Sequence, residues 1–428
     1  MLPVGIVGGW LASLPALAAA APGDPGAAPR FEELRLGLFV HYMYVGRPYQ
    51  WGSTPCADGQ PVGSLDELAD GLDVPDMVEL ARTMRAQYLQ FTTWHANMNA
   101  LYPSAVLAQR LPGHCARRDV IRDLIEALRP TGIRLILYLH PSDGHDFSPE
   151  DQERVGWNDG PPYARWNDFI NAAFAEVVER YGQEVAGYWI DGGLPPQVDP
   201  ARLRATIEQR DPGAWLIQNS GLNPACVDYG AHESLVAPYP GTAWQMCATI
   251  GDSWWASGSA ERIGPDLAFQ YTVLQAGVEG NTGGVAWSCG PYPGGQWEPH
   301  VRPFAQRLGE QVGRVAEALF GTRPNSAFVT RDGTPLTDVA YVATESLLGD
   351  TTYLHVLRPP AERQLDLPPP ADGRVFTAAA LLGDGGPVEL AQDDQGVHLA
   401  LSADDAWDPL DTVIVLRSAP GSTPSTGR

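Results

Sequence analysis

Short apolar runs alternate with helical patterns along the chain from residue 30 to about residue 324. The runs cover residues 36–42, 86–94, 133–140, 185–190, 215–218, 244–248 and 284–288. Runs of this length that are apolar nearly throughout are typical of strands covered on both faces, as in a parallel sheet. We therefore expect about seven buried strands joined by helices.

Helical patterns occupy segments between these runs. Residues 75–85, 118–129 and 168–181 place apolar side chains three and four positions apart, which predicts one buried face on each helix. Pro75 suits a first helical turn, and Pro130 would stop the second helix. Strand–helix units repeated over roughly 290 residues predict a (β/α)8-type barrel, with room for an imperfect one. No Gly-rich dinucleotide fingerprint follows any run, which disfavours a dinucleotide-binding sheet.

The pattern changes after residue 324. Short apolar runs at residues 340–343, 353–357, 397–401 and 412–416 are separated by Gly, Pro and Asp, without helical periodicity. This spacing predicts a small antiparallel β-sandwich. The expected organisation is a leader segment at 1–29, a catalytic barrel at 30–324, the sandwich at 325–418 and a disordered tail at 419–428.

The first residues resemble an export signal. Residues 2–21 are apolar and end in small side chains, although Arg30 is the first basic residue. We expect a secreted or periplasmic protein, or a cytoplasmic one if the start codon is misassigned. No later segment has the length and apolar character of a membrane span, so stable membrane insertion is not expected.

Composition narrows the range of partners. The formal net charge is −23, and all 28 basic residues are arginine. A nucleic acid would be repelled by this charge, whereas a neutral sugar would not. The five cysteines are widely spaced and form no CxxC pair, which predicts neither a zinc site nor a disulfide framework.

Four of the predicted strands end near a polar residue: His41, His95, His140 and Asp191. The carboxyl ends of barrel strands meet at one face, so these side chains are expected to converge. Asp191 follows a bulky apolar run and precedes Gly192, which would allow close approach by a substrate. The alternative for Asp191 is an ordinary turn aspartate.

Hydrolysis of a glycoside requires two carboxyl groups, one of which protonates the leaving oxygen. Glu233 lies on a later predicted loop and suits this second role. Asp143, Asp252 and Glu298 also lie on predicted loops, so the residue types alone leave the second carboxyl group open. A metal set built from His140, His145 and Asp143 is the less favoured interpretation, since no further ligand spacing accompanies them.

Seven segments resemble, in order, motifs of the α-L-fucosidases of glycoside hydrolase family 29. Residues 35–41 (RLGLFVH) resemble the family's KFGIFIHWG segment, and residues 92–104 (TTWHANMNALYPS) resemble its TAKHHDGFCLWPS run. The remaining resemblances are at 118–120 to KRDVV, 188–192 to WFDG, 228–233 to D-Y-x-T-P-E, 244–254 (WQMCATIGDSW) to WETCMTINDSW and 320–324 to YGTRP. Together they cover about 300 residues in the family's order.

The resemblance implies a retaining α-L-fucosidase that needs no metal or organic cofactor and acts on a carbohydrate or glycoside. It places the nucleophile at Asp191 and the acid/base at Glu233. The residues expected to bind the sugar are His41, His95, Trp51, Tyr188, Trp254 and His140.

The chain departs from the family pattern at two sugar-binding positions. Ala96 replaces the second His of the family's HH pair, and Ser220 stands where many members have an Arg. Losing several hydrogen-bonding partners while keeping the nucleophile suggests altered specificity. Three hypotheses follow: an active fucosidase, a glycosidase of the same fold that acts on another sugar, and a barrel that binds carbohydrate without cleaving it.

Overall fold

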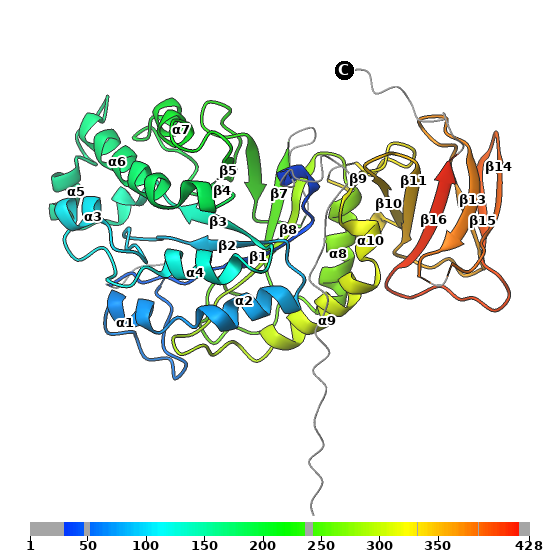
Figure 1. Ribbon diagram of the computed structural model, residues 1–428, viewed down its shortest axis with the longest axis horizontal. Coiled ribbons are helices and arrows are strands. Elements are labelled where there is room, and N and C mark those ends of the chain that lie inside the picture. The colour runs from blue at the N-terminus through cyan, green and yellow to red at the C-terminus, as the bar shows by residue number, and fades with distance from the viewer. Residues whose placement is uncertain (1–29, 47–51, 236–242, 332, 384, 419–428) are drawn as a thin grey trace, which may run out of the picture.

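A closed barrel of eight parallel strands forms the larger part of the molecule, and it confirms the (β/α)8-type fold (Figure 1). The computed structural model describes residues 30–46, 52–235, 243–331, 333–383 and 385–418. The strands follow one another around the barrel in chain order: β1 (Leu36–Val40), β2 (Tyr88–Thr92), β3 (Arg134–Leu139), β4 (Gly187–Ile190), β5 (Trp215–Asn219), β6 (Tyr229–His232), β7 (Trp244–Thr249) and β8 (Asn281–Cys289). The predicted leader and tail lie outside the described residues.

Helices cover the outside of the barrel. They are α1 (Leu65–Asp70), α2 (Val74–Thr83), α3 (Ala105–Arg110), α4 (Val120–Leu128), α5 (Pro149–Val155), α6 (Ala164–Tyr181), α7 (Pro200–Glu208), α8 (Pro265–Gly277), α9 (Val301–Arg314) and α10 (Ala316–Leu319). Residues 220–228, all of them described, contain no helix, so β5 and β6 are joined directly by a loop. The barrel is therefore imperfect at this point.

Local sequence explains where these helices begin and which face they bury. Asp119 precedes α4, and its carboxylate accepts a hydrogen bond from the backbone N–H of Arg122, as an N-cap residue does. The apolar positions of α4 are buried against the strands. Asp73 caps α2 in the same way, and Pro75 lies in the first turn of that helix.

The barrel interior is filled by alternate side chains of the strands. Trp189 of β4 lies there together with Tyr138 of β3 and Phe39 of β1. The neighbouring Tyr188 belongs to the other core cluster, which lies between the strands and the helices. This alternation fixes which strand residues reach the mouth of the barrel and which face the helices.

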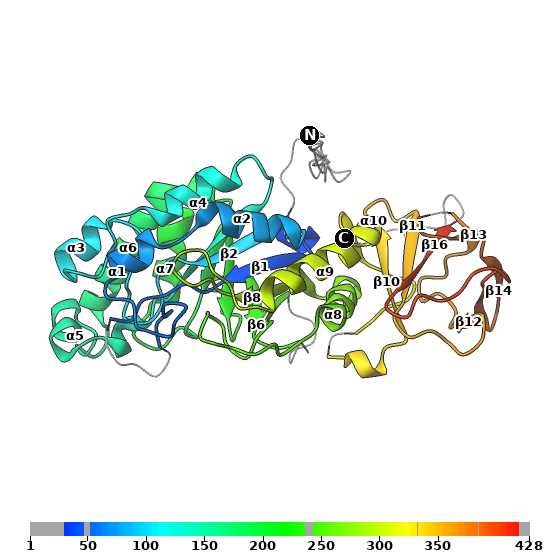
Figure 2. The ribbon, with the colours of Figure 1, turned by 90° about the horizontal axis from the view of Figure 1, so that it is seen from below.

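The C-terminal part is a sandwich of two antiparallel sheets, as expected. One sheet has five strands in the order β13 (Phe376–Leu381), β16 (Thr412–Ser418), β11 (Thr351–Val356), β10 (Tyr341–Ser346) and β9 (Thr322–Pro324). The other has three, in the order β12 (Gln364–Leu367), β15 (Gly396–Ala400) and β14 (Glu389–Asp393). Helices α8, α9 and α10 lie between this sandwich and the barrel, as Figures 1 and 2 show.

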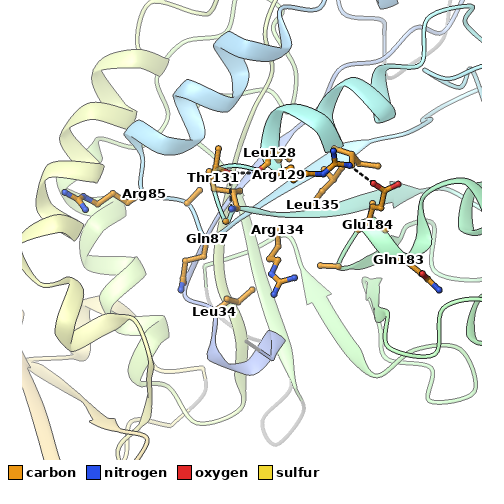
Figure 3. A pocket seen from close by; sticks show the side chains of 16 residues that line it. Leu34, Arg85, Gln87, Leu128, Arg129, Thr131, Arg134, Leu135, Gln183 and Glu184 are labelled. Atoms are coloured by element: carbon orange, nitrogen blue, oxygen red, sulfur yellow. Dashed lines mark hydrogen bonds and ion pairs between the residues drawn. The ribbon is translucent and has the colours of Figure 1, made fainter. Parts of the chain in front are cut away.

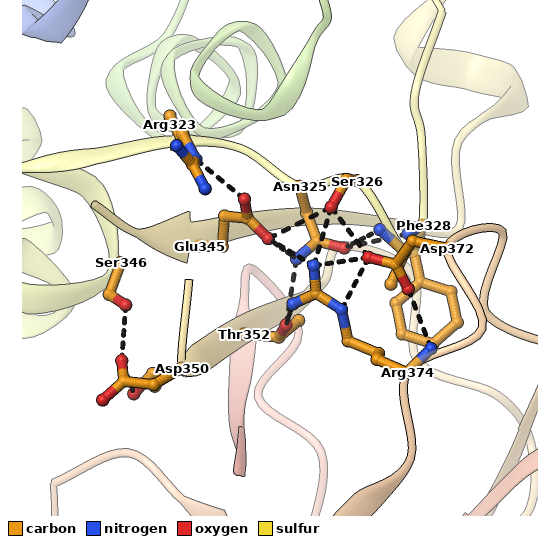
Figure 4. A network of polar contacts seen from close by, with 12 residues as sticks. Arg323, Asn325, Ser326, Phe328, Glu345, Ser346, Asp350, Thr352, Asp372 and Arg374 are labelled. Carbon is orange, nitrogen blue, oxygen red and sulfur yellow. Dashed lines mark hydrogen bonds and ion pairs between the residues drawn. The ribbon is translucent and has the colours of Figure 1, made fainter. Parts of the chain in front are cut away.

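A buried group of charges occupies one end of the sandwich (Figure 4). The side chain of Arg374 is 2% exposed and donates to Asp372 at 2.7 Å and to Glu345 at 2.8 Å. It also donates to the hydroxyls of Thr352 and Ser326. We call Arg374, Asp372 and Glu345 the sandwich charge cluster.

The described residues were also compared with two expectations from the sequence, on membrane spans and on disulfides. Within the described ranges, no helix combines the length and the apolar character that crossing a membrane requires. All five cysteines lie in these ranges and none forms a disulfide.

Candidate active site

A cavity of about 570 Å³ opens at the carboxyl ends of the barrel strands. Its lining comes from the strand ends and from the loops that follow them: His41, His95, His140, Ser142, His145, Trp157, Asp191, Gly192, Pro195, Gln197, Glu233, Trp254 and Trp255. The structure thus brings together six of the eight residues predicted for the site.

Asp191 directly follows β4 and lies on the same side of the strand as Trp189. Its Oδ2 accepts a hydrogen bond from the Tyr138 hydroxyl at 2.5 Å. Its Oδ1 accepts one from the backbone N–H of Gly192 at 2.8 Å. The carboxylate is therefore held in one orientation by donors from β3 and from its own loop.

The surroundings of Asp191 favour its ionised form. Burial by itself would raise the pKa of this carboxyl group. The imidazoles of His140 and His95 act in the opposite direction, as do hydrogen bonds from Tyr138 and Asn219. The net effect lowers the pKa of Asp191 below its ordinary value of 3.8, so the group is a carboxylate at neutral pH.

Asn219, the last residue of β5, connects two carboxyl groups. Its Nδ2 donates to Oδ1 of Asp191 at 2.8 Å and to Oε1 of Glu233 at 2.7 Å. Two oxygens bound to one nitrogen can be no farther apart than the sum of these lengths, 5.5 Å. Asp191 and Glu233 are therefore close neighbours in the cavity.

Glu233 directly follows β6, and its environment favours the protonated form. Burial and the negative charge of Asp191 both raise the pKa of Glu233 above its ordinary value of 4.5. The hydrogen bond from Asn219 opposes this shift only in part. The cavity thus holds an ionised carboxylate beside a carboxyl group that tends to keep its proton, which is the arrangement of a nucleophile with a general acid.

The other carboxyl groups considered for the second role lie in different settings. Oε1 of Glu298 accepts hydrogen bonds from the backbone N–H groups of residues 257, 258 and 259 and from the Tyr292 hydroxyl, so it organises a loop. Asp143 is buried in an ion pair with His140. Asp252 is exposed and outside the lining of the cavity.

His140 is a cationic neighbour of Asp191. Its Nδ1 lies 2.8 Å from Oδ1 of Asp143. Burial opposes charge on this ring, but the carboxylates of Asp143, Asp191 and Asp146 raise the pKa of His140 to about 9. A Cβ at Gly192 would lie 2.8 Å from His140 and 2.9 Å from Ser142, and the φ of Gly192 is +84°. Glycine at 192 therefore lets the chain pass directly over the imidazole ring.

His41 and His95 form a buried part of the cavity wall. Nδ1 of His41 lies 3.1 Å from the hydroxyl oxygen of Ser288, and the His95 ring stacks on Tyr138 with centroids 5.2 Å apart. Burial is the main cause that lowers the pKa of both histidines. Trp254 packs on His41 with centroids 5.2 Å apart, so an aromatic surface borders these rings.

One predicted sugar-binding residue, Tyr188, lies outside the cavity. Tyr188 is completely buried against the helix layer, where burial is the main cause that raises its pKa. Trp51 lies outside the described residues. Within the part of the chain that the structure describes, no group of three or more His, Cys, Asp or Glu side chains is placed to hold a metal ion.

Comparisons with known proteins show what this chain is similar to. The family model for α-L-fucosidase matches residues 69–270. The matched residues, a little under half of the chain, resemble the α-L-fucosidases of glycoside hydrolase family 29. The chain is 21% identical over 318 residues to a Caenorhabditis elegans protein named as a candidate α-L-fucosidase, and the match spans 70% of this chain and 62% of that protein.

Solved structures share the fold. A family 29 α-L-fucosidase from Bacteroides thetaiotaomicron, captured as a covalent intermediate with 2-fluoro-fucosyl fluoride, aligns with a TM-score of 0.68 at 19% identity over 91% of this chain and 95% of its own. The α-fucosidase of Thermotoga maritima aligns with a TM-score of 0.65 at 17% identity over 90% and 96%.

The structure shows what replaces the two missing family 29 residues. Ala96 is 1% exposed and packs with Met43 and Val45 against Trp255 in a small apolar cluster. Ser220 is exposed, with a φ of 57°, and lies outside the cavity lining. The chain therefore has an apolar patch beside the cavity where the family 29 pattern has a second imidazole.

Tyr138 and Asn219 were not among the residues predicted for the site. Strand alternation could have identified Tyr138, because it lies in β3 two residues before His140, which directly follows that strand. Asn219 directly follows the predicted strand at 215–218 and ends β5, so its place at the carboxyl end of a barrel strand was the signal that could have identified it.

A second cavity, of about 520 Å³, lies at the opposite end of the barrel (Figure 3). It is lined by apolar residues such as Leu34 and Leu135 and by Arg134, with Glu184 paired to Arg129 at its edge. It contains no pair of neighbouring carboxyl groups among its described lining residues, so the mouth with Asp191 is the candidate active site.

Proposed function

We propose that this protein hydrolyses terminal α-linked L-fucosides with retention of configuration. The observation that supports the proposal best is the pairing of Asp191 and Glu233 through the single nitrogen Nδ2 of Asn219. Carboxyl groups about 5–5.5 Å apart are typical of retaining enzymes, whereas inverting enzymes separate them by about 6.5–9.5 Å to admit a water molecule. The upper limit of 5.5 Å between their bridged oxygens favours retention.

In the first step, a carboxylate oxygen of Asp191 attacks the anomeric carbon and forms a glycosyl ester. Glu233 transfers its proton to the glycosidic oxygen as the bond from that oxygen to the anomeric carbon breaks, and the alcohol leaves. The lowered pKa of Asp191 and the raised pKa of Glu233 prepare both groups for these roles.

In the second step, the ionised Glu233 takes a proton from water while the water oxygen attacks the anomeric carbon. The ester bond to Asp191 breaks, and the sugar leaves with its original configuration. Tyr138 and Asn219 hold the Asp191 oxygens throughout, so little reorientation is needed between the steps. His41, His95 and Trp254 are proposed to contact the sugar.

A covalent label tests the proposal directly. A fluorine at C2 destabilises the transition states, so 2-fluoro-fucosyl fluoride should leave a lasting ester on the nucleophile. Mass spectrometry of the digested protein should find one 2-fluoro-fucosyl group on the peptide that contains Asp191. Asp191→Ala should abolish the label and lower turnover of an aryl α-L-fucoside about 10⁴-fold or more. Unchanged turnover in that variant would eliminate the mechanism.

A different sugar is the second candidate, favoured by the apolar cluster around Ala96. A pocket that lacks a hydrogen-bonding partner for one hydroxyl should discriminate less at that hydroxyl. Measuring kcat/KM for a panel of 4-nitrophenyl glycosides distinguishes the candidates. If the protein cleaves only another glycoside of the panel, that sugar replaces L-fucose as the proposed substrate. If it binds the glycosides of the panel and cleaves none, a non-catalytic carbohydrate-binding barrel is favoured.

A further inference from the structure

Gln245 places a polar side chain in the interior of the barrel. It is the second residue of β7 and is completely buried, as is its partner Tyr88, the first residue of β2. Barrel interiors are mostly filled by branched apolar side chains, which pack without needing a hydrogen-bonding partner. A buried amide, in contrast, has to be paired at both its oxygen and its nitrogen, so its presence here calls for a physical reason.

The amide of Gln245 is fully paired, and its orientation is determined. Oε1 accepts from the indole Nε1 of Trp189 at 2.8 Å, and Nε2 donates to the hydroxyl of Tyr88 at 2.8 Å and to Oε1 of Gln90 at 3.2 Å. An indole nitrogen can only donate, so the amide cannot be turned over without losing the bond to Trp189. Tyr88 in turn donates to the carbonyl of Gly283 in β8 at 2.7 Å, so the chain of bonds ends on the backbone of the barrel.

Trp189 lies next to Tyr138, the residue that donates to the Asp191 carboxylate. The two aromatic residues are direct partners in the pairing of β3 with β4, and their rings stack with centroids 5.3 Å apart at 22°. On the other side of β3, His95 follows β2, and its ring also stacks on Tyr138. The ring of Tyr138 is thus held by aromatic neighbours from both adjacent strands, with its hydroxyl 2.5 Å from Oδ2 of Asp191.

The bond to Gln245 selects one orientation of the Trp189 indole. Rotation about χ2 of a tryptophan is soft, so packing alone allows more than one position of the ring. Any other position takes the indole N–H away from its acceptor, and a buried donor without an acceptor is unfavourable. A fully paired polar network therefore fixes a ring orientation that an apolar side chain at position 245 would leave undetermined.

We propose that Gln245 is a positioning residue for the hydrolysis. It fixes the indole of Trp189, which fixes the ring of Tyr138, and Tyr138 then holds Asp191 in the orientation for attack. The inference rests on the proposed function, in which Asp191 is the nucleophile. Gln245 is outside the lining of the active-site cavity, so it acts through the two aromatic rings and not by contact with the sugar.

Gln245→Met tests the proposal, because methionine is of similar size and cannot accept from the Trp189 indole as an amide does. We expect kcat for 4-nitrophenyl α-L-fucoside to fall about tenfold, with KM within about twofold, since the substrate contacts are unchanged. The bond from Tyr138 lowers the pKa of Asp191, so weakening it should also move the acid limb of kcat/KM to higher pH. An unchanged kcat with an unchanged acid limb would overturn the proposal.

A second variant covers the case in which Gln245→Met does not fold. Trp189→Phe removes the indole N–H and keeps an aromatic ring beside Tyr138, so the ring loses its hydrogen bond to Gln245 by the opposite change. It should give the same fall in kcat and the same movement of the acid limb. Wild-type kinetics in a folded Trp189→Phe would contradict the role of this bond.

A double-mutant cycle tests the route through Tyr138. Tyr138→Phe removes the hydroxyl that donates to Asp191. Adding Gln245→Met to Tyr138→Phe should then lower kcat by no more than about twofold, because the bond that Gln245 maintains is already absent. A tenfold loss in both backgrounds would show that Gln245 acts independently of the Tyr138 hydroxyl, and would overturn the proposal.

Thr272 provides the matched control. It is completely buried, and its Oγ1 accepts from the indole Nε1 of Trp287 at 3.1 Å, in the core between the strands and the helices. Thr272→Val therefore also deprives a buried indole of its acceptor, and it should lower Tm as Gln245→Met does while leaving kcat and the acid limb in place. Equal kinetic changes in the two variants would assign the effect of Gln245 to a general loss of stability and refute the positioning role.

A measurement without turnover separates this inference from the proposed function. NMR titration of the aspartate carboxyl carbons gives the pKa of Asp191 directly, with its signal identified by its absence in Asp191→Asn. Gln245→Met should raise this pKa, and Thr272→Val should not. If the unmodified protein cleaves no fucoside, the proposed function fails, while the titration still decides whether Gln245 controls the setting of Asp191.

Discussion

The active site and the sandwich charge cluster are two buried groups of ionisable side chains with opposite organisation. In the sandwich charge cluster, the Arg374 guanidinium donates to two carboxylates and two hydroxyls, and Arg323 adds a second cation on Glu345 (Figure 4). At the barrel mouth, Asp191 and Glu233 share one amide donor, and both have a pKa shifted from its ordinary value, in opposite directions.

The contrast shows how similar residue types serve stability in one place and chemistry in another. A carboxylate that is fully bound to a guanidinium is stabilised and unreactive. Two neighbouring carboxyl groups that share one donor can have pKa values shifted in opposite directions, so that one is ionised and can attack while the other is protonated and can donate a proton. Replacing single members of each group should therefore affect different measurements.

The largest expected effect is on stability. Arg374→Met should leave Asp372 buried without its cation, and Glu345 with Arg323 as its remaining cation, and should lower the free energy of unfolding by about 3–5 kcal/mol. Denaturant unfolding measures this change, while kcat/KM per folded molecule should stay the same. Arg82→Met removes an exposed pair with Glu79 and should cost no more than about 1 kcal/mol. Equal stabilities of the two variants would contradict the role of the sandwich charge cluster.

The next effect is on activity. Asn219→Ala removes the donor to both carboxyl groups, so the pKa of Asp191 and that of Glu233 should both rise. We expect kcat/KM for an aryl fucoside to fall about 10- to 100-fold, with both limbs of its pH profile moved to higher pH. The exposed Asn158→Ala is the control. An unchanged profile would show that the amide bridge does not set these pKa values.

The smallest expected effect is a shift of the acid limb of the pH profile of kcat/KM. His140 is an imidazolium below pH about 9, and its charge lowers the pKa of Asp191. In His140→Gln the pKa of Asp191 should rise, so that Asp191 becomes protonated at a higher pH. The acid limb of the activity profile should therefore move to higher pH by about one unit. The acid limb of kcat/KM against pH measures the shift. His398→Gln, on the sandwich surface, should leave the limb in place.

The order of apolar runs was sufficient to predict the barrel, but not all of its strands. β6 escaped prediction because Tyr229–His232 contains Gly230 and Ala231, which provide little apolar bulk. α8 has no single apolar stripe, because neighbours cover it on several sides. In the sandwich, β14 alternates exposed and half-buried residues, so it gives no apolar run.

The site could be predicted where function falls on the residue after a strand, as at Asp191 and Glu233. Strand alternation would have corrected Tyr188: since Asp191 points to the mouth, Trp189 faces the interior and Tyr188 faces the helices. The sharing of Asn219 by two carboxyl groups depends on β4, β5 and β6 lying side by side, and a distance of this kind is absent from any linear pattern.

The position of α8 has a consequence for how the two halves of the molecule depend on each other. Gly277 meets the sandwich so closely that a Cβ there would lie 2.3 Å from a methyl carbon of Val342, and Val342 belongs to the same core cluster as the barrel helices. The sandwich therefore completes the hydrophobic core on this side of the barrel. A chain divided between the barrel and the sandwich would expose apolar side chains of both to solvent, so the two parts are expected to fold as one unit.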